Sequence, residues 1–337
     1  MNRQSEPREF SMRDELLPSP GEKTRASSEK TVHQNDFATR RSFLLAGTRG
    51  VAALGAAVPL VMAQSQEPSR QETSVKQQAS RWFFEPQDQS MISWLALPED
   101  EKVLDAGCGR GQHLQLFSEY LGAGAVTGVD INESRISDIQ ARIGRGELRG
   151  NIQAVAADVT SLPMQDSLFG CVWSSHTMHV LPDPVAGVRE LARVCKNGGR
   201  VVVREDRLLD RLLPFDVGLG KPGVEERAVA AFAEWYIGDR QQRGKLPIGW
   251  LEVLRQAGLH NVLARSFLFE RQPPFTEEEV AYLRDRKIRG LIRDSLNEED
   301  KQTLETLADE QSPAYAFDRN DLHFVSVATI YVGWKVG

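Results

Sequence analysis

Cysteine is scarce in this chain. Only Cys108, Cys171 and Cys195 stand among 337 residues, too few and too unevenly spaced for a disulfide framework or a zinc site. We therefore predict three small buried hydrophobic side chains and no bound metal. Cys108 is not predicted to be a nucleophile, because no cationic pattern surrounds it.

The chain also lacks a basic stripe and a long apolar run. Its formal net charge is −6, and its basic residues are interleaved with acidic ones, whereas nucleic-acid binding draws on clustered Lys and Arg. We therefore expect no nucleic-acid partner. The stretch GVAALGAAVPLVMA is shorter than the ~20 apolar residues of a stable membrane span, so no such span is expected. The composition, 41% hydrophobic and 26% charged, is that of a globular protein.

The first 78 residues read as segments outside the globular domain. Residues 1–39 are polar and are predicted to be disordered. In residues 40–63, Arg40 and Arg41 precede SFLLAG, a weakly apolar stretch and a V-x-A end. This order resembles a bacterial twin-arginine export signal. Residues 64–78 are predicted to be a solvated linker.

A β-α-β unit is predicted near the start of the globular part, which we place at 79–337. Two apolar runs, Lys102–Ala106 and Ala125–Val129, flank a segment of helix length. Between the first run and the helix, the spacing G-x-G-x-G permits positive φ and lets the backbone approach a ligand without an intervening Cβ. The sequence therefore predicts a ligand-binding turn.

Two classes of cofactor use a glycine-rich turn with a distal acid. Asp130 ends the second strand, where doubly wound folds place an acid on ribose hydroxyls. The dinucleotide fingerprint is G-x-G-x-x-G, but here Gln112 takes the sixth position. Asp105 would repel a pyrophosphate, whereas it suits a cationic amino group. A nicotinamide-dependent oxidoreductase is thus the less favoured alternative.

With DAGCGRG and its distal acid, the sequence resembles class I S-adenosylmethionine-dependent methyltransferases, particularly the group that includes ubiquinone and menaquinone biosynthesis enzymes. The resemblance implies methyl transfer from S-adenosyl-L-methionine to a small organic acceptor. It implies that Asp105 and the glycine turn hold the methionine part, that Asp130 holds the ribose, and that Asp158 and Val159 contact the adenine. The full set of predicted cofactor-binding residues is Asp105, Gly107, Gly109, Arg110, Gly111, Asp130, Ile131, Asp158, Val159 and Ser175.

The fold implied is α/β: a doubly wound, Rossmann-like seven-stranded sheet of order 3-2-1-4-5-7-6, with the last strand antiparallel. The remaining strands are expected at 152–159, 169–174, 200–203, 261–269 and 323–337. A helix is expected to begin at Pro184 and to stop at Gly198 and Gly199. A later helix should turn Trp250, Leu251, Leu254 and Leu259 toward the sheet.

Two helical insertions, at about 206–246 and 274–312, are expected to cover the substrate as a lid. The second should open with Thr276 and Glu279 as a capping box. Aromatic residues of the first, Phe232, Trp235 and Tyr236, either line an apolar substrate pocket or are ordinary core.

Methyl transfer from a sulfonium is an in-line displacement, which needs alignment and exclusion of water more than a base. His176, His179 and Glu205 are the candidate catalytic residues near the sheet edge. His179 is alternatively a residue that orients its loop, and Glu205 either faces the substrate or solvates the insertion.

The two ends of the chain point to different compartments. S-adenosylmethionine is made in the cytosol, whereas a twin-arginine signal directs export. An exported, non-catalytic S-adenosylmethionine-binding protein is therefore a further alternative, and the location stays open.

Overall fold

The computed structural model describes residues 83–205, 210–243 and 248–337, with the side chains of 235–243 excepted. All of them belong to one compact unit, Ser65–Gly337. The predicted disordered segment, export signal and linker lie outside the described residues.

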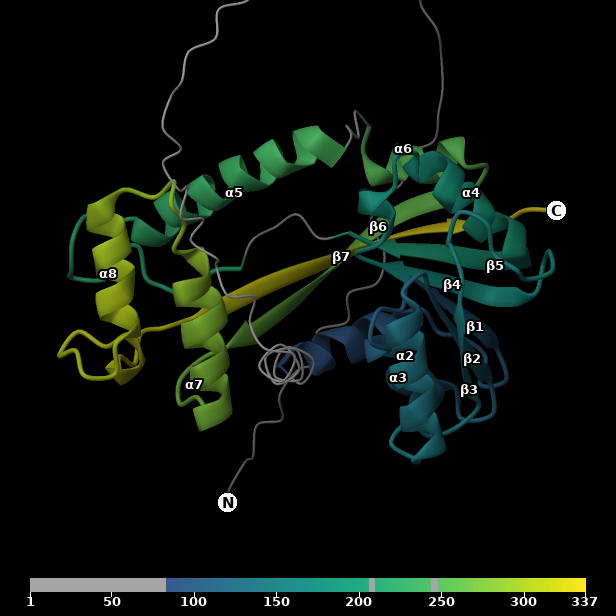
Figure 1. Cartoon of the computed structure of the whole chain (residues 1–337), viewed down its shortest axis with the longest axis horizontal. Coiled ribbons are helices and arrows are strands. Elements are labelled where there is room, and N and C mark those ends of the chain that lie inside the picture. Colours follow the sequence, from purple (N-terminus) through teal and green to yellow (C-terminus); the bar gives the residue numbers. More distant parts are fainter. Residues whose placement is uncertain (1–82, 206–209, 244–247) are drawn as a thin grey trace, which may run out of the picture. The chain divides into compact units, whose positions relative to one another are not determined.

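One seven-stranded sheet carries the domain (Figure 1). Its order is β3-β2-β1-β4-β5-β7-β6. The first five strands pair in parallel, and β7 is antiparallel to both β5 and β6. The predicted fold class, sheet order and antiparallel last strand are confirmed. The bounds are β1 Lys102–Ala106, β2 Ala125–Asp130, β3 Ile152–Ala156, β4 Phe169–Ser175, β5 Cys195–Arg204, β6 His260–Arg271 and β7 Phe324–Trp334.

Helices cover both faces of the sheet. On one face pack α2 (Gln112–Leu121), α3 (Glu133–Gly144) and the helical residues 83–94. On the other pack α4 (Pro184–Val194) and α6 (Trp250–Gln256). Successive strand side chains point to opposite faces, and the central parallel strands β1 and β4, which are covered on both sides, are accordingly buried along most of their length. The strand runs predicted from the sequence reflect this double burial.

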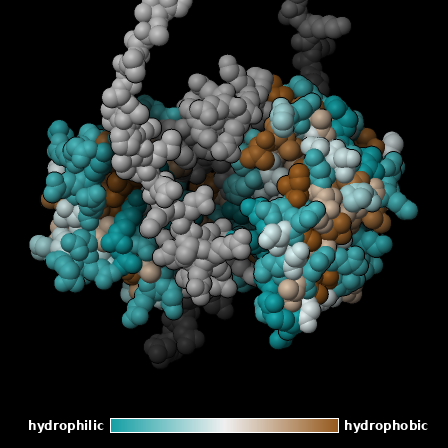
Figure 2. All heavy atoms as spheres, viewed as in Figure 1, coloured by the Kyte–Doolittle hydropathy of each residue, from teal (hydrophilic) through white to brown (hydrophobic). Residues whose placement is uncertain are grey.

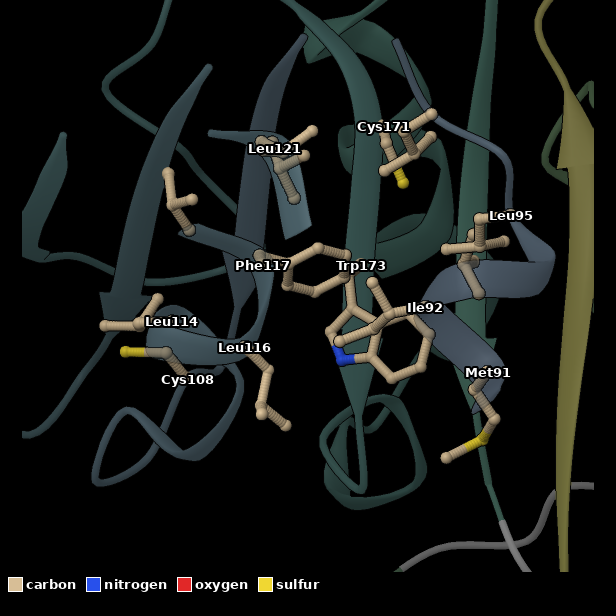
Figure 3. Close-up of a cluster of buried hydrophobic side chains, with 14 of the residues drawn as sticks. Met91, Ile92, Leu95, Cys108, Leu114, Leu116, Phe117, Leu121, Cys171 and Trp173 are labelled. Carbon is tan, nitrogen blue, oxygen red and sulfur yellow. The ribbon is translucent and has the colours of Figure 1, made fainter. Parts of the chain in front are cut away.

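The first face is packed around Trp173 of β4 (Figure 3). The ring of Phe117 in α2 meets the Trp173 indole edge-on at 5.6 Å between ring centroids. Met91 and Ile92 of the 83–94 helix join the same cluster. This packing fixes α2, and thereby the turn that precedes it, against β1 and β4.

The insertions form a helical part beside the ends of β6 and β7. It comprises α5 (Val224–Arg243), α7 (Glu277–Leu283), the π-helical turn η2 (Arg284–Ile288), the 3₁₀ turn η3 (Arg289–Leu291) and α8 (Glu298–Ala308). A third apolar cluster joins these helices to Phe83 and to Phe324 at the start of β7. Hydrophilic side chains predominate over α7 and α8 on the face in Figure 2. Within the described residues, no helix has the length and apolarity to cross a bilayer.

Three predicted details were wrong. The helix that begins at Pro184 ends at Val194, and Gly198 and Gly199 lie inside β5, where the pairing with β4 is irregular. At Gly199, a Cβ would lie 2.8 Å from Cys195 Sγ, so close packing explains the glycine better than a helix stop does. The strand predicted at 152–159 ends at Ala156. In α6, Leu251 is only half-buried, and Val253 takes its place in the core.

Candidate functional site

The glycine turn lies between β1 and α2, at the point where the sheet order reverses. Gly107, Gly109 and Gly111 have φ of +79°, +57° and +76°. At Gly107, a Cβ would fall 2.2 Å from Thr177 Oγ1, whereas at Gly109 it would meet nothing within 4 Å. The turn is thus packed at Gly107 against Thr177, just after β4. At Gly109 it borders open space, which leaves room for a ligand near the backbone.

Asp105 is the last but one residue of β1, two residues before the first glycine of the turn, and it is 1% exposed. Neither of its carboxylate oxygens has a hydrogen-bond partner among the described residues. Burial raises the pKa of Asp105 to about 6 from the usual 3.8; the charge of His113 opposes this rise, and that of Asp130 adds to it. A buried carboxylate without a donor is costly, and an incoming cationic group would relieve that cost.

Asp130 ends β2 directly beside the turn and is 6% exposed. Its Oδ2 accepts a hydrogen bond from the Gly109 N–H at 2.9 Å, and its Oδ1 accepts one from the Asn132 N–H at 2.9 Å. Arg135 approaches Oδ2 at 3.5 Å. The Asp130 carboxylate therefore holds the backbone of the glycine turn through Gly109, and it also lines the adjoining cavity.

That cavity, which we name the Asp130 cavity, has a volume of about 580 Å³. Apolar groups make up most of its lining. Its residues are Gly107, Asp130, Ile131, Asp158, Val159, Thr160, Thr177, Val180, Leu181, Pro182, Asp183 and Ala186. Five predicted cofactor residues are therefore brought together: Gly107, Asp130, Ile131, Asp158 and Val159.

Asp158 and Val159 follow β3 at the edge of this cavity. Oδ1 of Asp158 accepts hydrogen bonds from the N–H and the hydroxyl of Thr160, both at 2.8 Å. These bonds lower the pKa of Asp158. Val159 is buried against the second face of the sheet. The turn made by Asp158 is the reason why the strand ends before it.

A second cavity, the lid cavity, has a volume of about 520 Å³ and lies between the sheet edge and the helical part. Ser175 lines it, not the Asp130 cavity. The remaining lining residues are Phe84, Gln112, His113, His176, Arg204, Asp210, Phe232, Tyr282, Asp285, Arg286, Lys287, Gly290, Leu291, Arg293, Ser326 and Val327.

His176 is the predicted catalytic residue that the structure brings to this cavity. It is exposed, and its φ of +52° lies in the left-handed region that L side chains rarely adopt. Its N–H donates to the carbonyl of Arg204 at 3.0 Å, which ties the end of β4 to the end of β5. Such strain is found where the surroundings hold a residue in place, often at functional sites.

His179 and Glu205 are paired with each other. Glu205, 3% exposed, accepts from the His179 N–H at 3.1 Å, and its Oε2 lies 2.7 Å from His179 Nδ1. Neither residue lines either cavity. These contacts tie the segment after β4 to the residue that follows β5.

Sequence reasoning missed a buried polar network behind the lid cavity. Asp88, 1% exposed, accepts from Arg204 at 2.7 Å and from Gln112 Nε2 at 3.1 Å. His113 Nε2 lies 3.6 Å from Asp88 Oδ2, the oxygen that accepts from Gln112. Burial opposes the effect, but His113 and Arg204 lower the pKa of Asp88 overall. Arg204 directly follows the VVV run of β5, and that position at the carboxyl edge is the signal that could have indicated it.

The other predicted residues lie as follows. Gly109 and Gly111 are in the turn but line neither cavity, and the exposed Arg110 contributes its carbonyl to a 2.8 Å bond with Arg142. Cys108 is buried beneath the turn, and burial raises the pKa of its thiol, which disfavours the thiolate. Within the described part of the chain, no three His, Cys, Asp or Glu side chains gather as a metal site.

The residues present fit a sulfonium nucleoside with an amino-acid tail. The donor-free Asp105 carboxylate suits an ammonium, and the open space over Gly109 lets a ligand approach the turn. Asp130 and Asp158 offer acceptors to hydroxyl and amino groups, with apolar walls between them.

These features define a doubly wound, Rossmann-like α/β protein with its cavities at the carboxyl edge of a seven-stranded sheet. Residues 104–203, which extend from β1 to β5, match the family described as "Methyltransferase domain". The match thus covers the turn, all three acids that line the Asp130 cavity, and the lid-cavity residues Gln112, His113, Ser175 and His176.

Curated relatives resemble the same part of the chain. The ubiquinone/menaquinone biosynthesis C-methyltransferase of Pasteurella multocida is 37% identical over 110 residues, which are 31% of this chain and 39% of that enzyme. The 27-O-demethylrifamycin SV methyltransferase of Amycolatopsis mediterranei is 29% identical over 142 residues, 41% of this chain and 49% of the enzyme. The chain thus spans less than half the length of these relatives.

Solved structures are similar over more of the chain but at low identity. Phosphoethanolamine N-methyltransferase 2 of Haemonchus contortus, in complex with S-adenosyl-L-methionine, has a TM-score of 0.46 at 16% identity, covering 77% of this chain and 56% of its own. The YcgJ protein of Bacillus subtilis has a TM-score of 0.45 at 18% identity, covering 74% and 99%.

Proposed function

We propose that this protein is an S-adenosylmethionine-dependent methyltransferase that acts on a small organic acceptor. The observation that carries the proposal is the buried Asp105 carboxylate, which has no hydrogen-bond donor among the described residues. It shortly precedes the positive-φ glycine turn, whose Gly107 lines the Asp130 cavity. The match of residues 104–203 to a methyltransferase domain supports it.

In this proposal, each part of the cavity has one task. Asp105 and the turn Gly107–Gly111 hold the methionine part, Asp130 holds the ribose hydroxyls, and Asp158 and Val159 hold the adenine. The bound cofactor supplies an electrophilic methyl group on a sulfonium. The chain's own contribution is alignment of the acceptor with that methyl group and exclusion of water.

We assign the proton-accepting role, where the acceptor is a hydroxyl or an acidic carbon, to His176. It lines the lid cavity, whereas His179 and Glu205 face each other outside both cavities. The latter two are positioning residues, because their bonds hold the segment that carries His176. The insertions act as a lid over the acceptor.

The test is isothermal titration of the full chain with S-adenosylhomocysteine and, separately, with NAD. We expect binding of the first only. Asp130→Ala should weaken it by about tenfold or more, because charge-assisted bonds to ligand hydroxyls are lost. The matched control is Glu133→Ala, which removes an exposed carboxylate at the start of α3 and should leave affinity unchanged. A wild-type chain that binds NAD, or neither ligand, would refute the proposal.

We further propose that residues 40–63 act as a twin-arginine signal, on the order of their parts in the sequence. Fractionation of producing bacteria followed by sequencing of the mature N-terminus tests this. A start near Gln64 in the exported fraction is expected, and a start at Met1 would contradict processing. Binding of S-adenosylhomocysteine without turnover by the exported form would favour the non-catalytic alternative.

A further inference from the structure

We propose that the lid cavity is the acceptor site and that it selects an acceptor with a carboxylate or phosphate group on a flat apolar body. This inference rests on the proposed methyltransferase function and specifies its substrate class. Three observations support it: the position of the cavity, the charged side chains that line it, and the aromatic rings that two of those side chains contact.

The position follows from the end of β4. Ser175 and His176 line the lid cavity, and the next residue, Thr177, lines the Asp130 cavity. The two cavities therefore flank one short segment at the carboxyl edge of the sheet. An acceptor in the lid cavity would face a cofactor held by the glycine turn across this segment.

Positive charge predominates in the lining. Among the described residues that line the cavity, the charged side chains are four cations, Arg204, Arg286, Lys287 and Arg293, and two carboxylates, Asp210 and Asp285. Asp285 is held by Arg284 and Arg289, each at 2.9 Å, and neither of these arginines lines the cavity. Asp285 is therefore largely neutralised from outside, as Arg204 is by Asp88, and the described lining still holds more cations than carboxylates, which suits an anion.

The cations differ in how firmly they are held. Arg204 is 8% exposed and is fixed by Asp88 at 2.7 Å, and Lys287 is paired with Asp210. Arg286 is exposed, and no ion pair joins it to the part of the chain that the structure describes. A free guanidinium at the mouth of a cavity matches carboxylate and phosphate geometry in a bidentate manner.

Two of these cations, Arg293 and Lys287, lie over aromatic rings. The Arg293 guanidinium carbon lies 5.4 Å from the ring centre of Phe232, and Lys287 Nζ lies 5.3 Å from that of Phe84 and 5.7 Å from that of Tyr282. All three rings line the cavity. Cation–π contacts hold the charges beside apolar surface, so a flat apolar body and an anionic group can be bound together. This geometry answers the open question about Phe232 in favour of a pocket-lining role.

The cavity wall is a π-helical turn, not an ordinary surface helix. Asp285, Arg286 and Lys287 all belong to η2, Arg284–Ile288. Such turns are rare and are frequently found at functional sites. His176, in its left-handed conformation, lines the same cavity. Two uncommon backbone conformations thus flank the same cavity.

The experiment uses the full chain saturated with S-adenosylhomocysteine and three probes of one shape: 2-naphthoate, 2-naphthyl phosphate and neutral 2-naphthamide. Their dissociation constants are measured by titration calorimetry. We expect at least one anion to bind about tenfold or more tightly than the amide, the worth of one charge-assisted hydrogen bond. The two anions distinguish a carboxylate acceptor from a phosphate acceptor.

The variant pair Arg286→Gln with Arg293→Gln should reduce that preference to about threefold or less, with S-adenosylhomocysteine affinity within about twofold of the wild type. The control Arg255→Gln changes an exposed arginine of α6, on the other face of the sheet, and should retain the preference.

Equal binding of acid and amide, or no binding of either anion, would overturn the inference while cofactor binding stands. An equal loss of S-adenosylhomocysteine affinity would also overturn it, since the cations would then serve the cofactor. Loss of cofactor binding by the wild type would instead remove the proposed function.

Discussion

At the residue scale, Asp105 shows how much one carboxylate can indicate. Its place before the glycine turn was readable from the sequence, and so was its mismatch with a pyrophosphate. Its missing hydrogen-bond donor was not readable, because that depends on which groups β4 and α2 bring near it. The same limit applies to Asp88, whose partners lie in α2 and at the end of β5.

Asp105→Asn should stabilise the cofactor-free protein at neutral pH. The pKa of Asp105 is raised from 3.8 to about 6 in the fold, so the unfolded chain gives up this proton more readily. Stability therefore falls as pH rises from about 4 to about 6 and stays lower above it, by about 3 kcal/mol. Urea denaturation should show a more stable variant at pH 7 and little difference at pH 4, together with weaker binding of S-adenosylmethionine. A variant less stable than the wild type at pH 7 would contradict this account.

His176 offers a test of backbone strain at the proposed acceptor site. With φ at +52°, a glycine relieves the clash of Cβ with its own backbone, whereas an alanine does not. We expect His176→Gly to be about 1 kcal/mol more stable than His176→Ala in urea. Both should lose methyl transfer to a hydroxyl acceptor while still binding S-adenosylhomocysteine. An alanine variant as stable as the glycine variant would show that the conformation carries no strain.

At the element scale, strands were easier to predict than the ends of elements. Apolar runs covered on both faces identified the cores of the strands, but Gly198 and Gly199 were misread as a helix stop. Local propensity cannot distinguish a glycine that ends a helix from one that makes room for Cys195 Sγ within a strand. The capping box of α7 was predicted correctly, because its two bonds depend only on residues three apart.

Thr276→Ala should loosen α7 without affecting the sheet. The Thr276 hydroxyl accepts from the Glu279 N–H at 3.2 Å, and Glu279 accepts from the Thr276 N–H at 2.8 Å. Loss of an N-cap costs about 1 kcal/mol. Hydrogen exchange should accelerate in Glu277–Leu283 and not in α4. Asn132→Ala, which removes the cap of α3, is the control and should accelerate exchange in α3 alone; faster exchange throughout the domain in Thr276→Ala would contradict a local effect.

At the scale of the whole molecule, the sheet order followed from the family resemblance, since the β-α-β unit and later strands occur in the expected sequence. The place of the helical part did not follow. Its cluster joins Phe83 from the start of the described chain to Phe324 near its end. Contacts between residues so distant in sequence leave no local pattern. The sequence therefore indicated a lid and the candidates Ser175, His176 and Phe232, but not the cationic residues of the cavity lining.

The Asp88–Arg204 pair connects the same distant parts, since 116 residues separate its two members. Both side chains are buried, so substitution of either partner breaks a buried ion pair, which costs about 3 kcal/mol or more. Asp88→Asn and Arg204→Met should each lower the free energy of unfolding by that order in urea. The double variant should lose clearly less than the sum of the two, because the pair is already broken by the first substitution. Additive losses would mean that the two side chains stabilise the domain independently, and the helical residues 83–94 would then not be fastened to β5 by this pair.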